Sequence, residues 1–333
     1  MKVALDAMGG DYAPHKIVCG AVEALKQFKD LAVTLIGKKK IIEKELLKYQ
    51  HFERLDIIDA PEEIEMYEAP ARAIRNKKDS SIVKGMDLIK NKKADAFISA
   101  GNTGAVMAGG LFKVGRIKGI KRPSILINFP SIKGQTIVMD NGANADCKPE
   151  NLLEFAIMGQ VYSRKVNGVD KPRIGLLSIG EEKEKGNQLV KDSYQLIAKD
   201  FRITNFIGNV EGRDIFNGRC DLVICDGFVG NIVLKTTEGT ASYMFELLKE
   251  AFNKDLRAKL GAFILKPYLK KMKDKVDYRQ YGGAPLLGID GVVIISHGSS
   301  DEIAIINAIK VARKTYKEKI VELIKEEVKR DGE

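Results

Sequence analysis

The sequence predicts an α/β fold in which a largely parallel sheet is covered by helices on both faces. Short runs rich in Val, Ile and Leu alternate with longer amphipathic stretches along most of the chain. The 333 residues are 44% hydrophobic and 30% charged, which is enough apolar material to bury a full core. No linker and no change in charge pattern divides the chain, so we expect a single domain over residues 1–333.

Ten short apolar runs are the expected strands. They cover residues 2–7, 32–36, 55–59, 96–99, 124–128, 136–140, 174–178, 203–207, 221–225 and 292–296. The segments between them are expected to be mainly helical. The last segment, residues 299–329, begins with the capping-box spacing of Ser299 and Glu302 and carries an apolar stripe that is expected to pack into the core.

Residues 237–275 depart from this alternation. The pattern is helical throughout, with breaks expected at Gly261 and Pro267. Eight basic residues stand against two acidic ones in residues 254–275. Apolar residues recur there at i, i+4, i+7 and i+8, and they are Leu256, Leu260, Phe263 and Ile264. We expect a projecting amphipathic helical arm, whose stripe either packs against the subunit or a dimer partner or adsorbs to an anionic bilayer.

The composition limits the compartment and the chemistry. No stretch approaches the roughly 20 apolar residues of a membrane-spanning helix, and the charged N-terminus is unlike a signal peptide, so we expect a cytoplasmic protein. The four cysteines, which are Cys19, Cys147, Cys220 and Cys225, lack a paired metal-ligand spacing. They are expected to be structural thiols, with neither a metal nor another cofactor.

The net charge of +10 favours an acidic partner. Nucleic acid, an anionic membrane surface and an acidic carrier protein all fit, and so does a basic surface with no partner. Tryptophan is absent and no basic run is interleaved with aromatic residues, so nucleic acid is not the expected partner.

Glycine-rich turns follow six of the expected strands. They are DAMGGD (6–11), SAGNTG (99–104), DNGAN (140–144), SIGEEKEKGN (178–187), DGFVGN (226–231) and SHGSS (296–300). Because ligands of parallel sheets bind at the carboxyl ends of the strands, we expect the six turns to lie together in register. Glycine lets the backbone approach a ligand, and a following helix presents unpaired N–H groups. The turns therefore predict a phosphate site, although each glycine alone could serve only its turn.

Other features narrow the chemistry. The dinucleotide, Walker A, zinc-protease and nucleophile-elbow signatures are absent. His15 and His51 are expected to be structural or solvated, whereas His297 could either bind a ligand or hold its turn. Without a nucleophile beside a base, we expect direct attack by one bound substrate on another. The available donors are Asn102, Asn144, Asn187, Asn231 and Lys185.

The order and spacing of the motifs resemble the bacterial phosphate acyltransferase family of phospholipid synthesis nearly from end to end. The motifs are DAMGGDYAP, ISAGNTGA, DNGAN, KGN (185–187), DGFVGN, YGGA (281–284) and SHGSS. The resemblance implies a fold similar to phosphate acetyltransferases and isocitrate-type dehydrogenases, a homodimer, and peripheral association with the inner face of the cell membrane through the arm. The implied reaction transfers a long-chain acyl group from acyl carrier protein to inorganic phosphate.

The resemblance also implies roles for individual residues. Lys185 would neutralise the attacking phosphate or the developing oxyanion, and Asn231 would orient the thioester carbonyl. Because Lys183 lies two residues away, the assignment between the lysines is open. Tyr12 and Val229 stand where many members carry histidine and threonine, which puts a catalytic role for either in doubt. The implied substrate-binding and phosphate-binding residues are Asp6, Gly9, Gly10, Asp11, Asn102, Thr103, Gly104, Asn144 and His297, and the membrane contacts are Leu256, Leu260, Phe263 and Ile264.

Three rival functions remain open. A phosphate acetyltransferase would use an acyl-coenzyme A donor for the same chemistry. A decarboxylating dehydrogenase of the isocitrate type would need an aspartate cluster for a divalent metal, and no convincing one is evident in the sequence. A nucleic-acid-binding protein would rest on basic charge alone.

Overall fold

A computed structural model describes residues 1–276 and 282–330 of the chain. Its strands are β1 (Lys2–Asp6), β2 (Ala32–Gly37), β3 (Leu55–Asp59), β4 (Ala96–Ser99), β5 (Ser124–Ser131), β6 (Gly134–Met139), β7 (Ile174–Leu177), β8 (Phe206–Val210), β9 (Leu222–Ile224), β10 (Ala284–Leu287) and β11 (Val292–Ile295). Its helices are α1 (His15–Gln27), α2 (Lys39–Leu46), α3 (Pro70–Asn76), α4 (Ser81–Lys90), α5 (Thr103–Gly109), the π-helix η1 (Gly110–Val114), α6 (Pro149–Val166), α7 (Gln188–Lys199), α8 (Asp214–Asn217), α9 (Gly227–Asn253), α10 (Leu256–Val276), α11 (Glu302–Lys317) and α12 (Ile320–Lys329).

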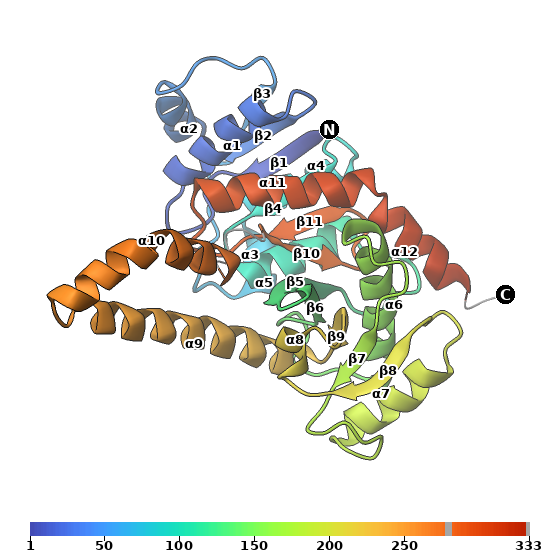
Figure 1. The fold of residues 1–333 in the computed structure, drawn as a ribbon. Coiled ribbons are helices and arrows are strands. Elements are labelled where there is room, and N and C mark those ends of the chain that lie inside the picture. The colour runs from blue at the N-terminus through green and yellow to red at the C-terminus, as the bar shows by residue number, and fades with distance from the viewer. Residues whose placement is uncertain (277–281, 331–333) are drawn as a thin grey trace.

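In the described residues, one eleven-stranded sheet has the order β3-β2-β1-β4-β11-β10-β5-β6-β9-β7-β8 (Figure 1). Seven neighbouring pairs are parallel and three are antiparallel, so the predicted largely parallel sheet is confirmed. The antiparallel pairs are consecutive in space, namely β11 with β10, β10 with β5, and β5 with β6. As a result, β6, β9, β7 and β8 run opposite to β1, β4 and β11.

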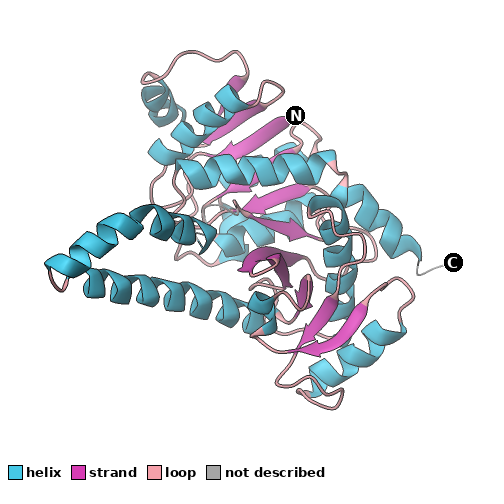
Figure 2. Cartoon of the chain, viewed as in Figure 1, coloured by secondary structure: helices cyan, strands magenta, loops and turns pink. Residues whose placement is uncertain are grey.

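Helices cover both faces of the sheet because side chains alternate along each strand (Figure 2). Val3 and Leu5 of β1 pack with α1 and α11, whereas Ala4 packs on the opposite face with α3, α4 and α5. In the other half, α6 and α12 continue the α1 and α11 face, and α8 and the first turns of α9 cover the other. Two hydrophobic clusters lie on the face covered by α5 and α9, one under α3, α4 and α5 and the other under α8 and α9. Ile127 of β5 contacts both clusters, so α5 and α9 cover neighbouring parts of the same face.

The strands follow the sequence prediction with three differences. β5 ends three residues later than expected, at Ser131. β8 begins three residues later than expected, at Phe206. β10, at Ala284–Leu287, was not expected, because four residues that follow a glycine pair and include Pro285 are typical of a loop.

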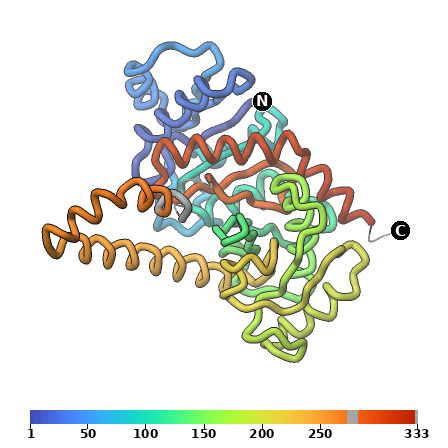
Figure 3. The backbone as a smooth tube through the Cα atoms, viewed as in Figure 1, coloured from blue at the N-terminus to red at the C-terminus, as the bar shows by residue number. Residues whose placement is uncertain are grey.

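The predicted arm region forms a hairpin of two long helices, α9 and α10 (Figure 3). The breaks expected at Gly261 and Pro267 are wrong, since both residues lie inside α10. The chain breaks instead at Lys254 and Asp255, where Asp255 Oδ1 accepts a hydrogen bond from Ala258 N at 2.8 Å. Pro267 fits within α10 because residues 263–268 are exposed, and water can satisfy the carbonyl that loses its partner.

The C-terminal segment forms α11 and α12, which are separated at Lys319, where φ is 52°. The predicted capping box of Ser299 and Glu302 does not form, because the third residue of α11 is Ala304, whose side chain cannot return a hydrogen bond to the cap. Asp301, not Ser299, caps α11, and its Oδ1 accepts from Ala304 N at 3.0 Å. Among the helices that the structure describes, none is long and apolar enough to cross a membrane.

Candidate active site

The six glycine-rich turns form two groups, so the prediction of six turns in register is wrong. The first loop group follows β1, β4 and β11 and comprises residues 6–11, 99–104 and 296–300. The second loop group follows β6, β7 and β9 and comprises residues 140–144, 178–187 and 226–231. The three antiparallel pairs between β11 and β6 reverse the strand direction and send the second group off the other edge of the sheet.

The turns of the first loop group are in contact with one another. Asp11 N donates to the carbonyl of Gly298 at 2.8 Å, which joins the turn after β1 to the turn after β11. Ser99 Oγ donates to Asp6 Oδ2 at 2.7 Å and ties the turn after β4 to them. A Cβ at Gly9 would lie 2.6 Å from the nitrogen of Gly101, so this close packing requires glycine.

Asp6 lies beneath the first loop group rather than at its surface. Its side chain is buried, and Met8 N donates to Oδ1 at 3.0 Å. Burial raises the pKa of Asp6, while hydrogen bonds that include those from Ser81 and Ser99 act in the opposite direction. This geometry suits a carboxylate that fixes the turns more than one that touches a substrate.

Asn102 also has a positioning task. Its Oδ1 accepts from Ala105 N at 3.0 Å and caps α5. Its Nδ2 lies 3.1 to 3.2 Å from three carbonyl oxygens, those of Glu65, Met66 and Glu68. The amide donors expected for a ligand are therefore occupied within the protein.

Two further predicted residues begin α5. Thr103 is exposed at its first position. Gly104 lies against α3, where a Cβ would approach Pro70 Cγ to 2.5 Å. Within the SAGNTG turn, Thr103 is thus the side chain open to a ligand.

His297 is exposed in the turn after β11, and its ring contributes to that turn. Nδ1 accepts from Ser299 N at 3.2 Å and lies 2.8 Å from Ser299 Oγ. The His297 ring therefore helps to hold the turn from within.

The second loop group is organised around Asp140, a residue that sequence reasoning did not single out. Its carboxylate is fully buried and accepts from Ile125 N at 2.9 Å and Asn144 N at 2.7 Å. Burial raises the pKa of Asp140 despite these bonds. Asn144 Nδ2 donates to Asp140 Oδ2 at 2.9 Å and to the Pro123 carbonyl at 2.7 Å, so Asn144 also holds the loop.

The first turn of α9 lies directly on this loop. Gly227 N donates to the Asn144 carbonyl at 2.8 Å, and a Cβ at Gly227 would lie 2.7 Å from that oxygen. A Cβ at Gly230 would overlap the carbonyl oxygen of Asp140. The two glycines of DGFVGN, three residues apart after the cap residue Asp226, are the sequence signal for this contact.

The two predicted catalytic side chains, Lys185 and Asn231, are both exposed in the second loop group. Asn231 lies beside Gly142, where φ is 96° and a Cβ would be 3.6 Å from Asn231 Oδ1. The turns that carry Lys185 and Asn231 follow neighbouring parallel strands, β7 and β9. They therefore leave the same edge of the sheet.

The two candidate lysines differ in their surroundings. Lys183 Nζ lies 5.7 Å from the centre of the Tyr194 ring. Asn209 Nδ2 holds this turn by donating to the Glu182 carbonyl at 2.8 Å. Lys185 has no acidic partner within the described part of the chain.

The α9–α10 hairpin connects the two loop groups. α9 begins at Gly227 in the second group. After α10 the chain enters β10, where Ala284 pairs with Ile295, the residue before the SHGSS turn of the first group (Figure 1). Tyr281 of the YGGA motif lies outside the described residues.

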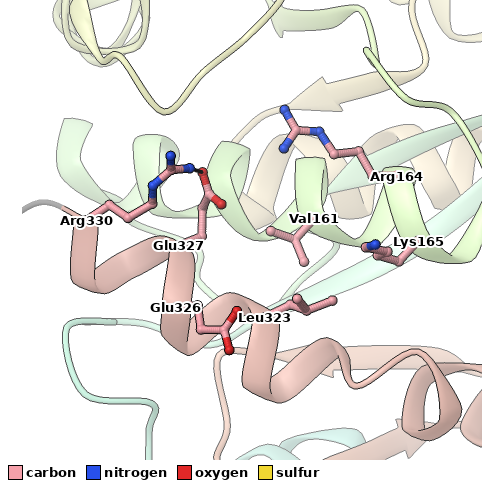
Figure 4. Close-up of a pocket in the computed structure, with 7 residues that line it drawn as sticks. All are labelled: Val161, Arg164, Lys165, Leu323, Glu326, Glu327 and Arg330. Carbon is pink, nitrogen blue, oxygen red and sulfur yellow. Dashed lines mark hydrogen bonds and ion pairs between the residues drawn. The ribbon is translucent and has the colours of Figure 1, made fainter.

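A cavity of about 340 Å³ lies elsewhere, between α6 and α12 (Figure 4). Its lining residues are Val161, Arg164, Lys165, Leu323, Glu326, Glu327 and Arg330. Arg330 pairs with Glu327 at 3.2 Å. These helices cover the face opposite to α5 and α9, so the cavity is separate from the loop groups. Across residues 1–276 and 282–330, no group of three or more His, Cys, Asp or Glu side chains could hold a metal ion.

The family model for a fatty acid synthesis protein matches residues 1–323. The chain belongs to the fatty acid synthesis protein family. A member from Halothermothrix orenii, a phosphate acyltransferase, is 61% identical over 334 residues and covers all of both chains. A phosphate acyltransferase from Alkaliphilus oremlandii is 52% identical, covering 100% of this chain and 99% of the relative.

Two solved structures of low sequence identity share the fold of this chain. A phosphotransacetylase from Streptococcus pyogenes has a TM-score of 0.62 at 15% identity, covering 96% of this chain and 94% of its own. A branched-chain phosphotransacylase from Enterococcus faecalis V583 has a TM-score of 0.61 at 13% identity, covering 95% and 99%. The predicted likeness to phosphate acetyltransferases is confirmed for the fold.

Proposed function

We propose that this phosphate acyltransferase of fatty acid and phospholipid synthesis transfers a long-chain acyl group from acyl carrier protein to inorganic phosphate. The observation that carries the proposal is the full-length match, at 61% identity, to a phosphate acyltransferase. The two groups of glycine-rich turns support it, because they offer backbone N–H groups and polar side chains suited to phosphate.

The proposed reaction is a direct displacement. A phosphate oxygen attacks the thioester carbonyl carbon, a tetrahedral intermediate forms, and the C–S bond breaks to give acyl phosphate and the carrier thiolate, which then takes a proton. The Lys185 ammonium would stabilise the phosphate charge, and the Asn231 amide would donate to the carbonyl oxygen as negative charge develops there. Both side chains are exposed and so accessible to two substrates.

We propose that α10 adsorbs to the inner face of the cell membrane and that the enzyme is a cytoplasmic homodimer. Four apolar side chains of α10 support adsorption, since Leu256, Leu260, Phe263 and Ile264 are each at least 63% exposed among basic residues. On α9, Tyr243, Met244 and Leu247 are exposed and suit contact with a second copy of the chain.

The decisive experiment mixes palmitoyl acyl carrier protein, inorganic phosphate and the enzyme, and measures acyl phosphate and free carrier thiol in equal amounts. Palmitoyl-coenzyme A at the same concentration is the control donor and is expected to react more slowly. If folded enzyme makes no acyl phosphate, the proposal is contradicted. If the enzyme clearly prefers palmitoyl-coenzyme A, the acyl donor is an acyl-coenzyme A and not acyl carrier protein.

A further inference from the structure

A short turn, residues 65–68, lies over the first loop group and is held from two sides. From below, Asn102 Nδ2 lies within 3.2 Å of the carbonyls of Glu65, Met66 and Glu68. From the side, Lys77 Nζ donates to Glu68 Oε1 at 2.5 Å, and the same carboxylate accepts from Glu65 N at 2.8 Å. The turn is therefore tied to the base of the loop group as well as within itself.

This turn presents two apolar side chains to solvent. Met66 is 57% exposed and Tyr67 is 87% exposed. Met66 Cε lies 3.7 Å from the position that a Cβ would take on Gly298, in the turn after β11. Met66 and Tyr67 thus form an apolar lip at the edge of the first loop group, with Met66 beside Gly298.

Exposure of one apolar side chain needs no explanation, because single exposed hydrophobic residues are common. Two features set the lip apart. Its backbone is anchored by a buried side chain, Asn102, that also caps α5 through Ala105 N. It also adjoins turns that are rich in glycine and polar residues. The buried side-chain amide of Asn102 therefore fixes the apolar lip relative to the polar turns of the first loop group.

We infer that Met66 and Tyr67 form a binding subsite for the aliphatic chain of the acyl thioester. This inference rests on the proposed function and adds a contact that selects the donor. A long-chain thioester has a polar reacting end and an apolar tail. In the proposed function the reacting end lies at Lys185 and Asn231 in the second loop group, so the lip at the first loop group would meet only the far part of a long tail. The thioether of Met66 adapts to a flexible chain, and the Tyr67 ring adds apolar area with a polar tip in water.

The test compares donors of different chain length on the variant Met66→Ser/Tyr67→Ser. Because the lip would contact only the tail, kcat/KM with palmitoyl acyl carrier protein should fall by about 10-fold to 100-fold. With butyryl acyl carrier protein it should change by less than about 3-fold. The loss should be mainly in KM, since contacts that are equal in the ground and transition states leave kcat unchanged.

The control is Ile132→Ser/Phe201→Ser, which removes two similarly exposed apolar side chains, 81% and 69%, outside the loop groups. It should leave the chain-length profile unchanged. Equal loss for both donors, or no loss, would overturn the subsite. So would a changed sedimentation coefficient or weaker liposome binding of the lip variant with an intact profile, because the lip would then contact a second copy or a bilayer. If unmodified enzyme makes no acyl phosphate from either donor, the proposed function fails instead.

Discussion

Two buried carboxylates, Asp6 and Asp140, hold the two loop groups in shape. Asp6 ends β1 and Asp140 follows β6, and each accepts hydrogen bonds from the turn that it begins. In both, burial raises the pKa of the carboxyl group. The side chains left to meet substrate are the exposed ones beside them, such as Thr103, Lys185 and Asn231.

The contact between α9 and the Asp140 turn depends on a glycine. We expect Gly230→Ala to lower the free energy of unfolding by about 2–4 kcal/mol, because its Cβ would overlap the Asp140 carbonyl oxygen. Gly239→Ala on the same helix meets open space, and should raise that free energy by about 0.5–1 kcal/mol. Urea denaturation of both variants measures the difference, and similar effects at the two sites would contradict this packing.

A second residue-scale prediction separates the two lysines. Lys185→Ala should lower kcat for acyl phosphate formation by about 100-fold or more, because charge stabilisation is lost where the transition state forms. Its free energy of unfolding should change by less than about 0.5 kcal/mol, since the side chain is exposed. Lys183→Ala is the control and should keep most of the activity. The opposite ranking would make Lys183 the functional lysine.

Sequence reasoning identified many of the site residues but not their burial. It singled out Asn102 and Asn144 as donors to a ligand, because amides in glycine-rich turns suit phosphate, and the family resemblance added Asp6. In the structure their hydrogen bonds go mainly to backbone groups of the protein. A sequence records that a polar group is present in a turn, whereas the direction in which its donors point depends on the packing of distant segments.

At the scale of elements, strand positions were predictable and strand directions were not. Local periodicity locates β1 or β11 because each is a short run of Val, Ile or Leu. β10 carries no such signal, and its two antiparallel pairings cancel, so β5 runs in the direction of β11. The second half of the sheet is reversed by the antiparallel pairing of β5 with β6, two strands whose positions were predicted but whose relative direction was not. That pairing divides the expected single row of turns into two groups.

The helical arm supports a prediction of its own. Leu260→Glu should reduce sedimentation with vesicles of anionic lipid several-fold, because a charged side chain at an apolar contact must be dehydrated. The enzyme should stay folded and keep its activity with a soluble donor. Leu47→Glu is the matched control, as Leu47 is 85% exposed beside α2, away from the arm. Equal sedimentation of the Leu260 variant and unmodified enzyme would count against the arm as the anchor.

At the scale of the whole molecule, the net charge of +10 governs encounters with an acidic carrier. We expect kcat/KM for the acyl carrier donor to fall about 5-fold or more between roughly 50 and 500 mM salt, because ions screen long-range attraction. An uncharged acyl thioester of pantetheine serves as the control and should show little change. Equal salt dependence for both donors would indicate that charge affects the chemical step instead.

The hairpin that joins the two loop groups has a mechanical consequence. α9 has 27 residues and is about 40 Å long, and it begins on the Asp140 turn without an intervening joint. α10 leads back toward the strand that precedes the SHGSS turn. The base of the hairpin therefore has two ends, and they lie at opposite edges of the sheet. Movement of its far end would turn α9 as one rigid rod and would displace the Asp140 turn against which Gly227 and Gly230 pack.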